Sequence, residues 1–194
     1  MNKVLSLVLG VATLVVGAGV VVPKASAQAV TREGLTVQLA VGAGATSFLA
    51  TGRDTDTWGG VSVPNLQVGG FVTPDLAITV KASALLWSPF RSGDWDLGIS
   101  GFAGPNAQFW LSNSLSLEVG VGLGLLLANP NENPLVDWDP GPSHATGLGL
   151  ALAANYFFMT GDSQALGIQA QVQPTITDEG LFLTYQLAVV CQAN

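Results

Sequence analysis

Apolar and polar positions alternate along a short stretch in the middle of the chain, LSLEVGVGLGLLLA, residues 115–128. Its odd positions from 115 to 127 are leucine or valine, whereas its even positions from 116 to 124 are serine, glutamate and glycine. A strand places such a glycine row on one face, whereas a helix scatters it around its circumference. Glycine also costs about 1 kcal/mol per residue inside a helix. The pattern therefore predicts a β-strand and not a membrane helix.

The same period of two recurs in seven further segments. Each is close to the roughly 9–11 residues that a tilted membrane strand requires. No apolar run after residue 27 approaches the roughly 18 residues of a spanning helix. The sequence therefore predicts an all-β fold of eight antiparallel strands. These predicted strands are 35–45, 65–72, 76–87, 96–111, 115–128, 146–158, 165–176 and 181–192.

The connections between these strands alternate in length. The second, fourth and sixth are short, whereas the first, third and fifth are long and span 46–64, 88–95 and 129–143. The seventh, 177–180, is short although it falls on the side of the long ones. Short periplasmic turns with longer extracellular loops are typical of outer-membrane barrels. We therefore expect an eight-stranded antiparallel up-and-down transmembrane β-barrel.

The first residues of the chain have the three parts of an export signal. Lys3 precedes an apolar stretch, 4–22, and the small-x-small triplet Ala25-Ser26-Ala27 follows it. This pattern predicts a signal peptide, 1–27, cleaved after Ala27, and a barrel domain, 28–194. An uncleaved membrane anchor is the alternative, because the apolar part is longer than usual.

The composition is unusual for a secreted soluble protein. Hydrophobic residues make up 48% and charged residues 10% of the chain, against about 25% charged in soluble domains. Residues 28–194 hold four basic residues against 13 acidic ones, a formal charge of −9, which argues against nucleic acid as a partner. A soluble sandwich or lipocalin-like barrel stays the alternative, because alternation alone does not say which face points inward.

Aromatic residues gather near both ends of the predicted strands, as expected of two interfacial girdles. On this basis we assign Trp87 and Trp95 to an outer girdle at the long connections. An inner girdle at the short turns is assigned Phe109, Trp110, Tyr156 and Phe158.

Two charges fall on the lumenal face by parity, Lys81 and Glu118, together with the polar residues Asn106 and Gln108. A charge inside a low-dielectric barrel needs a partner. We therefore expect either a Lys81–Glu118 pair or a shared polar network, with separate hydration of each charge as the alternative. No catalytic residue, metal ligand or cofactor is predicted.

The glycine row also predicts how two strands pair. If the turn 112–114 brings Leu111 opposite Leu115, glycines face larger side chains across the strand pair. The lumen of an eight-stranded barrel is just wide enough for side chains to fill, so this register predicts a filled barrel and not an open pore. The opposed residues are then Gly124 with Phe102 and Gly120 with Asn106.

The phrase FVTPDLAITV, 71–80, in which an aromatic strand end meets a short turn, is similar to turns in a known group. With the strand count, the loop asymmetry and the signal peptide, the chain resembles the small eight-stranded outer-membrane proteins of Gram-negative bacteria: OmpX, OmpW and the OmpA transmembrane domain. The resemblance implies location in the outer membrane, contact with its lipid and lipopolysaccharide, and insertion by the barrel-assembly machinery. One feature departs: such barrels usually end on an aromatic residue, whereas this chain ends AVVCQAN, 188–194, and its nearest aromatic is Tyr185.

Three functions are compatible with this fold. The first is a structural or surface-interaction role, in which extracellular loops bind a ligand that the sequence does not name. The second is a narrow channel for small or apolar solutes, as similarity to the OmpW group implies. The third is a lipid A-modifying enzyme, which rests on His144 beside Ser143 and Thr146; no orienting carboxylate is evident, and a solvated loop histidine is favoured.

Acidic residues cluster in the predicted external connections, in RDTDT, 53–57, and NENPLVDWD, 131–139. Calcium prefers oxygen ligands of this kind, but neither segment has the spacing of a known calcium loop. Ordinary solvated carboxylates are therefore favoured, and cations that bridge them to lipopolysaccharide phosphates are an intermediate interpretation.

Overall fold

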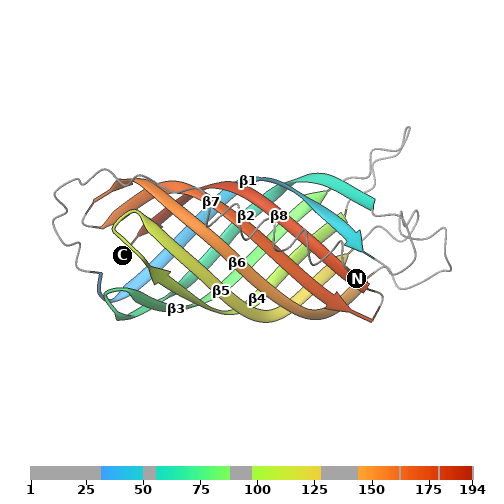
Figure 1. Cartoon of the computed structure of the whole chain (residues 1–194), viewed down its shortest axis with the longest axis horizontal. Helices are drawn as coiled ribbons and strands as arrows, with labels where there is room; N and C mark the ends of the chain where they lie inside the picture. The colour runs from blue at the N-terminus through green and yellow to red at the C-terminus, as the bar shows by residue number, and fades with distance from the viewer. Residues whose placement is uncertain are drawn as a thin grey trace.

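The computed structural model describes residues 32–49, 56–87, 98–127, 144–161, 163–178 and 180–193. They form a closed barrel in which each strand pairs antiparallel with its neighbours in chain order and β1 pairs with β8 (Figure 1). The prediction of an eight-stranded antiparallel barrel is confirmed. The strands are β1 (Leu35–Leu49), β2 (Asp56–Thr73), β3 (Leu76–Trp87), β4 (Gly98–Trp110), β5 (Leu115–Leu127), β6 (His144–Thr160), β7 (Gln164–Thr177) and β8 (Gly180–Ala193).

Two further sequence predictions concern the signal peptide and membrane-spanning helices. The predicted signal peptide, 1–27, lies outside the described residues and stays a prediction. Within the part of the chain that the structure describes, no helix has the length and apolar character needed to cross a bilayer.

The first long connection is shorter than the sequence predicted. β1 runs on to Leu49 and β2 begins at Asp56, so most of 46–64 belongs to strands and the predicted boundaries were wrong there. Ladder pairs such as Thr46 with Trp58 hold this extension. Polar and glycine residues on both faces of it hide the alternation from which strands are recognised.

The two ends of the barrel differ in their connections. We call one end the turn end. It carries the short connections 74–75, 111–114 and 161–163, together with the first residue of β1 and the last residue of β8. The loop end carries the connections 50–55, 88–97 and 128–143, with the short 178–179. The long axis of the barrel, horizontal in Figure 1, joins the two ends.

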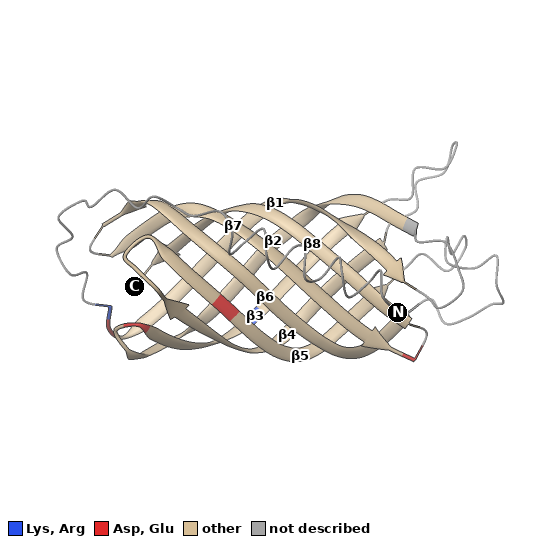
Figure 2. Cartoon of the chain, in the orientation of Figure 1, with Lys and Arg blue, Asp and Glu red and all other residues tan. Residues whose placement is uncertain are grey.

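The outer wall of the barrel is apolar. Val80 is 66% exposed and Leu187 is 63% exposed, whereas Gln108 and Gln169 are almost fully buried in the lumen. Figure 2 shows the described strands nearly bare of charge, with coloured residues mainly at the ends. The acidic residue of β5, Glu118, is buried in the lumen and does not contribute to the outer wall. Water would favour the reverse arrangement, whereas lipid favours this one. The soluble alternative is wrong, and the chain forms a membrane-spanning barrel of the outer-membrane type.

The pairing of β4 with β5 follows the predicted register. Leu111 donates a backbone hydrogen bond to Leu115 across the turn, 2.9 Å. Gly124 lies opposite Phe102 and Gly120 lies opposite Asn106, as the glycine row predicted. A Cβ added at Gly120 would stand 3.2 Å from the Phe102 ring. These glycines therefore leave room for larger lumenal side chains, and the predicted register is confirmed.

Apolar side chains close the lumen at both ends. The loop-end cluster is packed around a Trp58–Trp87 stack, with ring centroids 5.0 Å apart. The turn-end cluster is packed around a Trp110–Phe157 stack of the same separation. The loop-end cluster comprises Phe48, Leu85, Trp87, Leu126, Ala145 and Phe182, with Trp58 against it; the turn-end cluster comprises Ala40, Trp110, Phe157, Ala165, Ala188 and Val190, with Phe71 against it.

Candidate functional site

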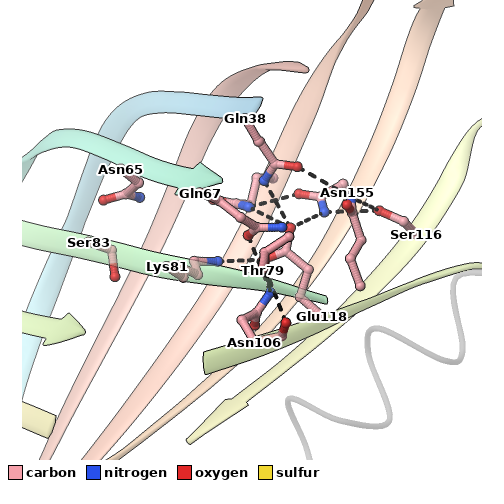
Figure 3. A network of polar contacts seen from close by, with 12 residues as sticks. Gln38, Asn65, Gln67, Thr79, Lys81, Ser83, Asn106, Ser116, Glu118 and Asn155 are labelled. Atoms are coloured by element: carbon pink, nitrogen blue, oxygen red, sulfur yellow. Dashed lines mark hydrogen bonds and ion pairs between the residues drawn. The ribbon is translucent and has the colours of Figure 1, made fainter. Parts of the chain in front are cut away.

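The polar centre of the lumen is organised around one carboxylate, that of Glu118 on β5. Its Oε2 accepts from Lys81 Nζ on β3 at 2.5 Å, and its Oε1 accepts from Gln38 Nε2 on β1 at 2.9 Å. Asn155 on β6 and Gln169 on β7 also donate to Oε1, at 2.6 and 3.4 Å. Figure 3 shows most of these side chains converging from different strands. One acceptor group therefore ties five strands of the wall together.

Lys81 and Glu118 differ in how many hydrogen-bond partners they have besides each other. The ammonium has one hydrogen-bond acceptor among the described residues, the Glu118 carboxylate, and its side chain is 1% exposed. The carboxylate has three amide donors besides. Of the arrangements left open by the sequence, the structure shows the pair and the shared network together.

Gln108 and Asn106, the other two residues assigned to the lumen by parity, extend this network. Gln108 Nε2 donates to Ser116 at 3.1 Å and to Gln192 at 3.0 Å, toward the turn end. Asn106 Nδ2 donates to Gln67 Oε1 at 3.3 Å. All are buried, so amide and hydroxyl groups occupy the middle of the lumen and many of them bond one another. Some of their polar atoms, among them Gln108 Oε1 and Asn106 Oδ1, have no hydrogen-bond partner among the described residues.

Two of the residues assigned to aromatic girdles point inward instead. Trp87 is 1% exposed and Trp110 is 5% exposed, and each belongs to a cluster that closes one end of the lumen. Their assignment to girdles was wrong, because strand parity puts Trp87 on the face of Lys81 and Trp110 on the face of Gln108. Phe71, Phe157 and Trp58 also pack against or within these clusters.

The remaining girdle residues lie as follows. Phe109 is 43%, Tyr156 37% and Phe158 55% exposed on the outer wall near the turn end. Trp95 lies outside the described residues.

Arg32, which sequence reasoning missed, contacts the turn-end cluster. Its guanidinium carbon lies 3.7 Å from the centroid of the Trp110 ring, and its Nη2 donates to the Asn113 carbonyl at 3.3 Å. Burial lowers the pKa of the guanidinium, and the charge of Asp75 opposes this effect. Because an arginine side chain stays protonated in proteins, a full positive charge stands over the Trp110 ring.

The residues on which a lipid-modifying enzyme would rest are only partly described. Thr146 is exposed on β6, whereas Ser143 and the side chain of His144 lie outside the described residues. The structure therefore brings no nucleophile, base and orienting group together among the side chains it describes.

Known structures share this architecture. The crystal structure of Ail, the attachment invasion locus protein of Yersinia pestis, matches with a TM-score of 0.54 and 16% identity, over 81% of this chain and 97% of that one. Ail in complex with the heparin analogue sucrose octasulfate gives 0.52 and 16%, over 81% and 98%. Neisserial surface protein A gives 0.52 and 16%, over 82% and 96%. The fold is that of the small eight-stranded outer-membrane barrels.

The predicted resemblance to this group is thereby confirmed at the level of the fold. No protein-family model matches the chain, and no curated protein matches it.

Proposed function

We propose that this protein resides in the outer membrane as a closed barrel and acts through its loop end, in a structural or surface-interaction role. The closed lumen is the observation that carries the proposal: an aromatic stack blocks each end, and a hydrogen-bonded network around Glu118 fills the middle. A barrel whose interior is packed offers its surroundings mainly its outer wall and its connections. The wall is apolar and suits lipid, which leaves the loop end for specific contacts.

The short turns support an orientation of the barrel in which the loop end faces the exterior of the cell. In outer-membrane barrels the short connections face the periplasm and the longer ones face outward. The turn end then faces the periplasm and the loop end the exterior. This orientation also agrees with the predicted export signal, 1–27.

The chemistry of the loop end favours cationic partners over polyanionic ones. Only Arg53 and Arg91 supply basic groups there. Opposite charges raise encounter rates and like charges suppress wrong partners. Ail was crystallised with a sulfated heparin analogue, and the acidic connections of this chain do not suit such a ligand. The acidic residues in or beside these connections are Asp54, Asp56, Asp94, Asp96, Glu132, Asp137, Asp139, Asp178 and Glu179.

Binding to intact cells tests this role. Cells that display the protein are incubated with fluorescent polylysine or fluorescent heparin, and bound fluorescence is compared with that of cells carrying an Asp137→Asn, Asp139→Asn variant. We expect the display of the protein to increase polylysine binding, the variant to reduce that increase, and heparin binding to stay at background. Equal polylysine binding with and without the protein would contradict the proposal. A protease-accessible epitope inserted after Asn131 checks the orientation independently.

The competing channel function is disfavoured by the same closed lumen. A lumen that fills with side chains has no continuous aqueous path for a solute. Conductance across a planar bilayer separates the two functions.

A further inference from the structure

The turn end is covered by residues that are not part of the barrel wall. Residues 32–34 precede β1, and Gly34 adopts a left-handed backbone with φ of +77°. L side chains rarely adopt this conformation, and here it redirects the chain just before the first strand. The Gly34 carbonyl accepts a hydrogen bond from the Phe71 amide at 3.0 Å, which fastens the segment to the end of β2.

From this position Arg32 reaches the opposite side of the barrel. β1 pairs with β2 and β8, whereas Trp110 ends β4 and Asn113 lies in the turn between β4 and β5. In a closed ring of eight strands, β5 is the strand farthest from β1. The contacts of the guanidinium with Trp110 and Asn113 therefore span the mouth of the lumen.

Arg32 also fixes the residue that closes this end. The guanidinium lies over the Trp110 ring, and that ring stacks on Phe157 at 5.0 Å. The side chain of Gln108, two positions before Trp110 and on the same face, is fully buried behind this stack. A stacked cation and a carbonyl acceptor together restrict the ring to its closed position.

We propose that residues 32–34 form a latch that holds the turn end of the lumen shut, with Arg32 locking Trp110 across the mouth. The segment lies outside the strand ladder, so it can detach while every strand pair stays intact. Both clusters are made of strand residues, but only the turn-end cluster has its tryptophan held by Arg32, so detachment frees the Trp110 ring and exposes the polar lumen at the turn end only. The barrel then becomes a pocket that opens toward one compartment, and not a channel.

Cysteine labelling at two depths tests the latch. In a Cys191→Ser background, Gln108→Cys places a thiol behind Trp110, and Ser100→Cys places one in the hydroxyl cluster with Thr46 and Thr184 nearer the loop end. A polar maleimide is added to each protein, folded in micelles, with and without Arg32→Ala. The matched control is Glu33→Ala, which removes the neighbouring, exposed charge.

We expect Arg32→Ala to raise the labelling rate at position 108 by about tenfold, since a local closed state that loses its main contacts opens more often. The rate at position 100 should not change, and Glu33→Ala should change neither rate. An unchanged rate at position 108, or an equal rise at both positions, would overturn the latch.

Hydrogen exchange gives a second measurement in case the cysteine at 108 perturbs folding. In the protein with its natural Gln108, Arg32→Ala should speed exchange of the Phe71 amide, which bonds Gly34, by about tenfold relative to ladder amides of β6. Equal exchange in the two proteins would equally overturn the proposal. If the latch fails while the wild-type barrel stays non-conducting, the closed-barrel function stands without it.

Discussion

The two ends of this barrel are closed by similar aromatic stacks but in different ways. The Trp58–Trp87 and Trp110–Phe157 stacks have the same centroid separation, 5.0 Å, and the same interplanar angle, 20°. Among the described residues the loop end is closed by strand residues alone, whereas the turn end adds Arg32 from outside the wall. The loop-end closure therefore depends on the strands and on no flanking segment among the described residues. A closure that includes a flanking segment can open on its own.

The largest expected effect on the free energy of unfolding comes from substitution of Glu118, which lies between the two ends. Glu118→Leu strands the Lys81 ammonium in the lumen, and removing one partner of a buried pair costs about 3–5 kcal/mol of unfolding free energy. Lys81→Met should cost less, about 1–3 kcal/mol, because three amides still donate to the carboxylate. The double variant should lose less than Glu118→Leu alone. Urea unfolding in lipid vesicles, followed by tryptophan fluorescence, measures all three.

The order of the two single variants is the informative result. A loss from Lys81→Met that equals or exceeds that from Glu118→Leu would show that the carboxylate is not the hub of the network.

A smaller effect concerns packing near the loop end. A Cβ at Gly124 would stand 2.3 Å from the Thr175 side chain, whereas a Cβ at Gly59, on the outer wall, meets nothing within 4 Å. Gly124→Ala should therefore cost about 1–3 kcal/mol through overpacking, and Gly59→Ala should stay within about 0.5 kcal/mol. Thermal unfolding by heat-modified gel mobility compares them. Similar midpoints for both variants would mean that the lumen is looser than the structure shows.

The smallest expected effect is the coupling energy between Arg32 and each closing tryptophan, and it distinguishes the two ends most directly. In a double-mutant cycle, Arg32→Ala and Trp110→Leu should couple by about 0.5–2 kcal/mol, the size of a cation–π contact. Arg32→Ala and Trp87→Leu are far apart and should add within about 0.5 kcal/mol. Equal coupling energies with both tryptophans would contradict the claim that Arg32 contributes to closure at the turn end only.

Much of this architecture could be predicted because apolar and polar residues alternate along a membrane strand, so its two faces are visible in the sequence. Parity gave the strand count and placed Lys81 and Glu118 on the polar face of their strands. Parity together with the turn 112–114 gave the pairing of Gly124 with Phe102. Parity also puts Trp87 and Trp110 on the inward face, whereas the general preference of aromatics for membrane interfaces predicts a girdle position for them. Where aromatics share a face with lumenal charges, parity is the stronger guide.

Other features depend on how the barrel closes. Lys81 and Glu118 lie on β3 and β5, which do not pair, so their contact follows from the curvature of the closed sheet. The Arg32 contact crosses the mouth between elements far apart in sequence and carries no periodic signal. Such contacts become visible only when the relative stagger of all eight strands is known.

Planar-bilayer conductance tests the central claim, a barrel closed at both ends, most directly. The purified wild-type protein and the Lys81→Met variant are inserted beside an open porin as a positive control, at neutral pH and high salt. The closed barrel predicts no stable conductance steps from either protein, because both aromatic stacks remain in place. Long-lived, ohmic steps from the wild-type protein would contradict it and would favour the narrow channel instead.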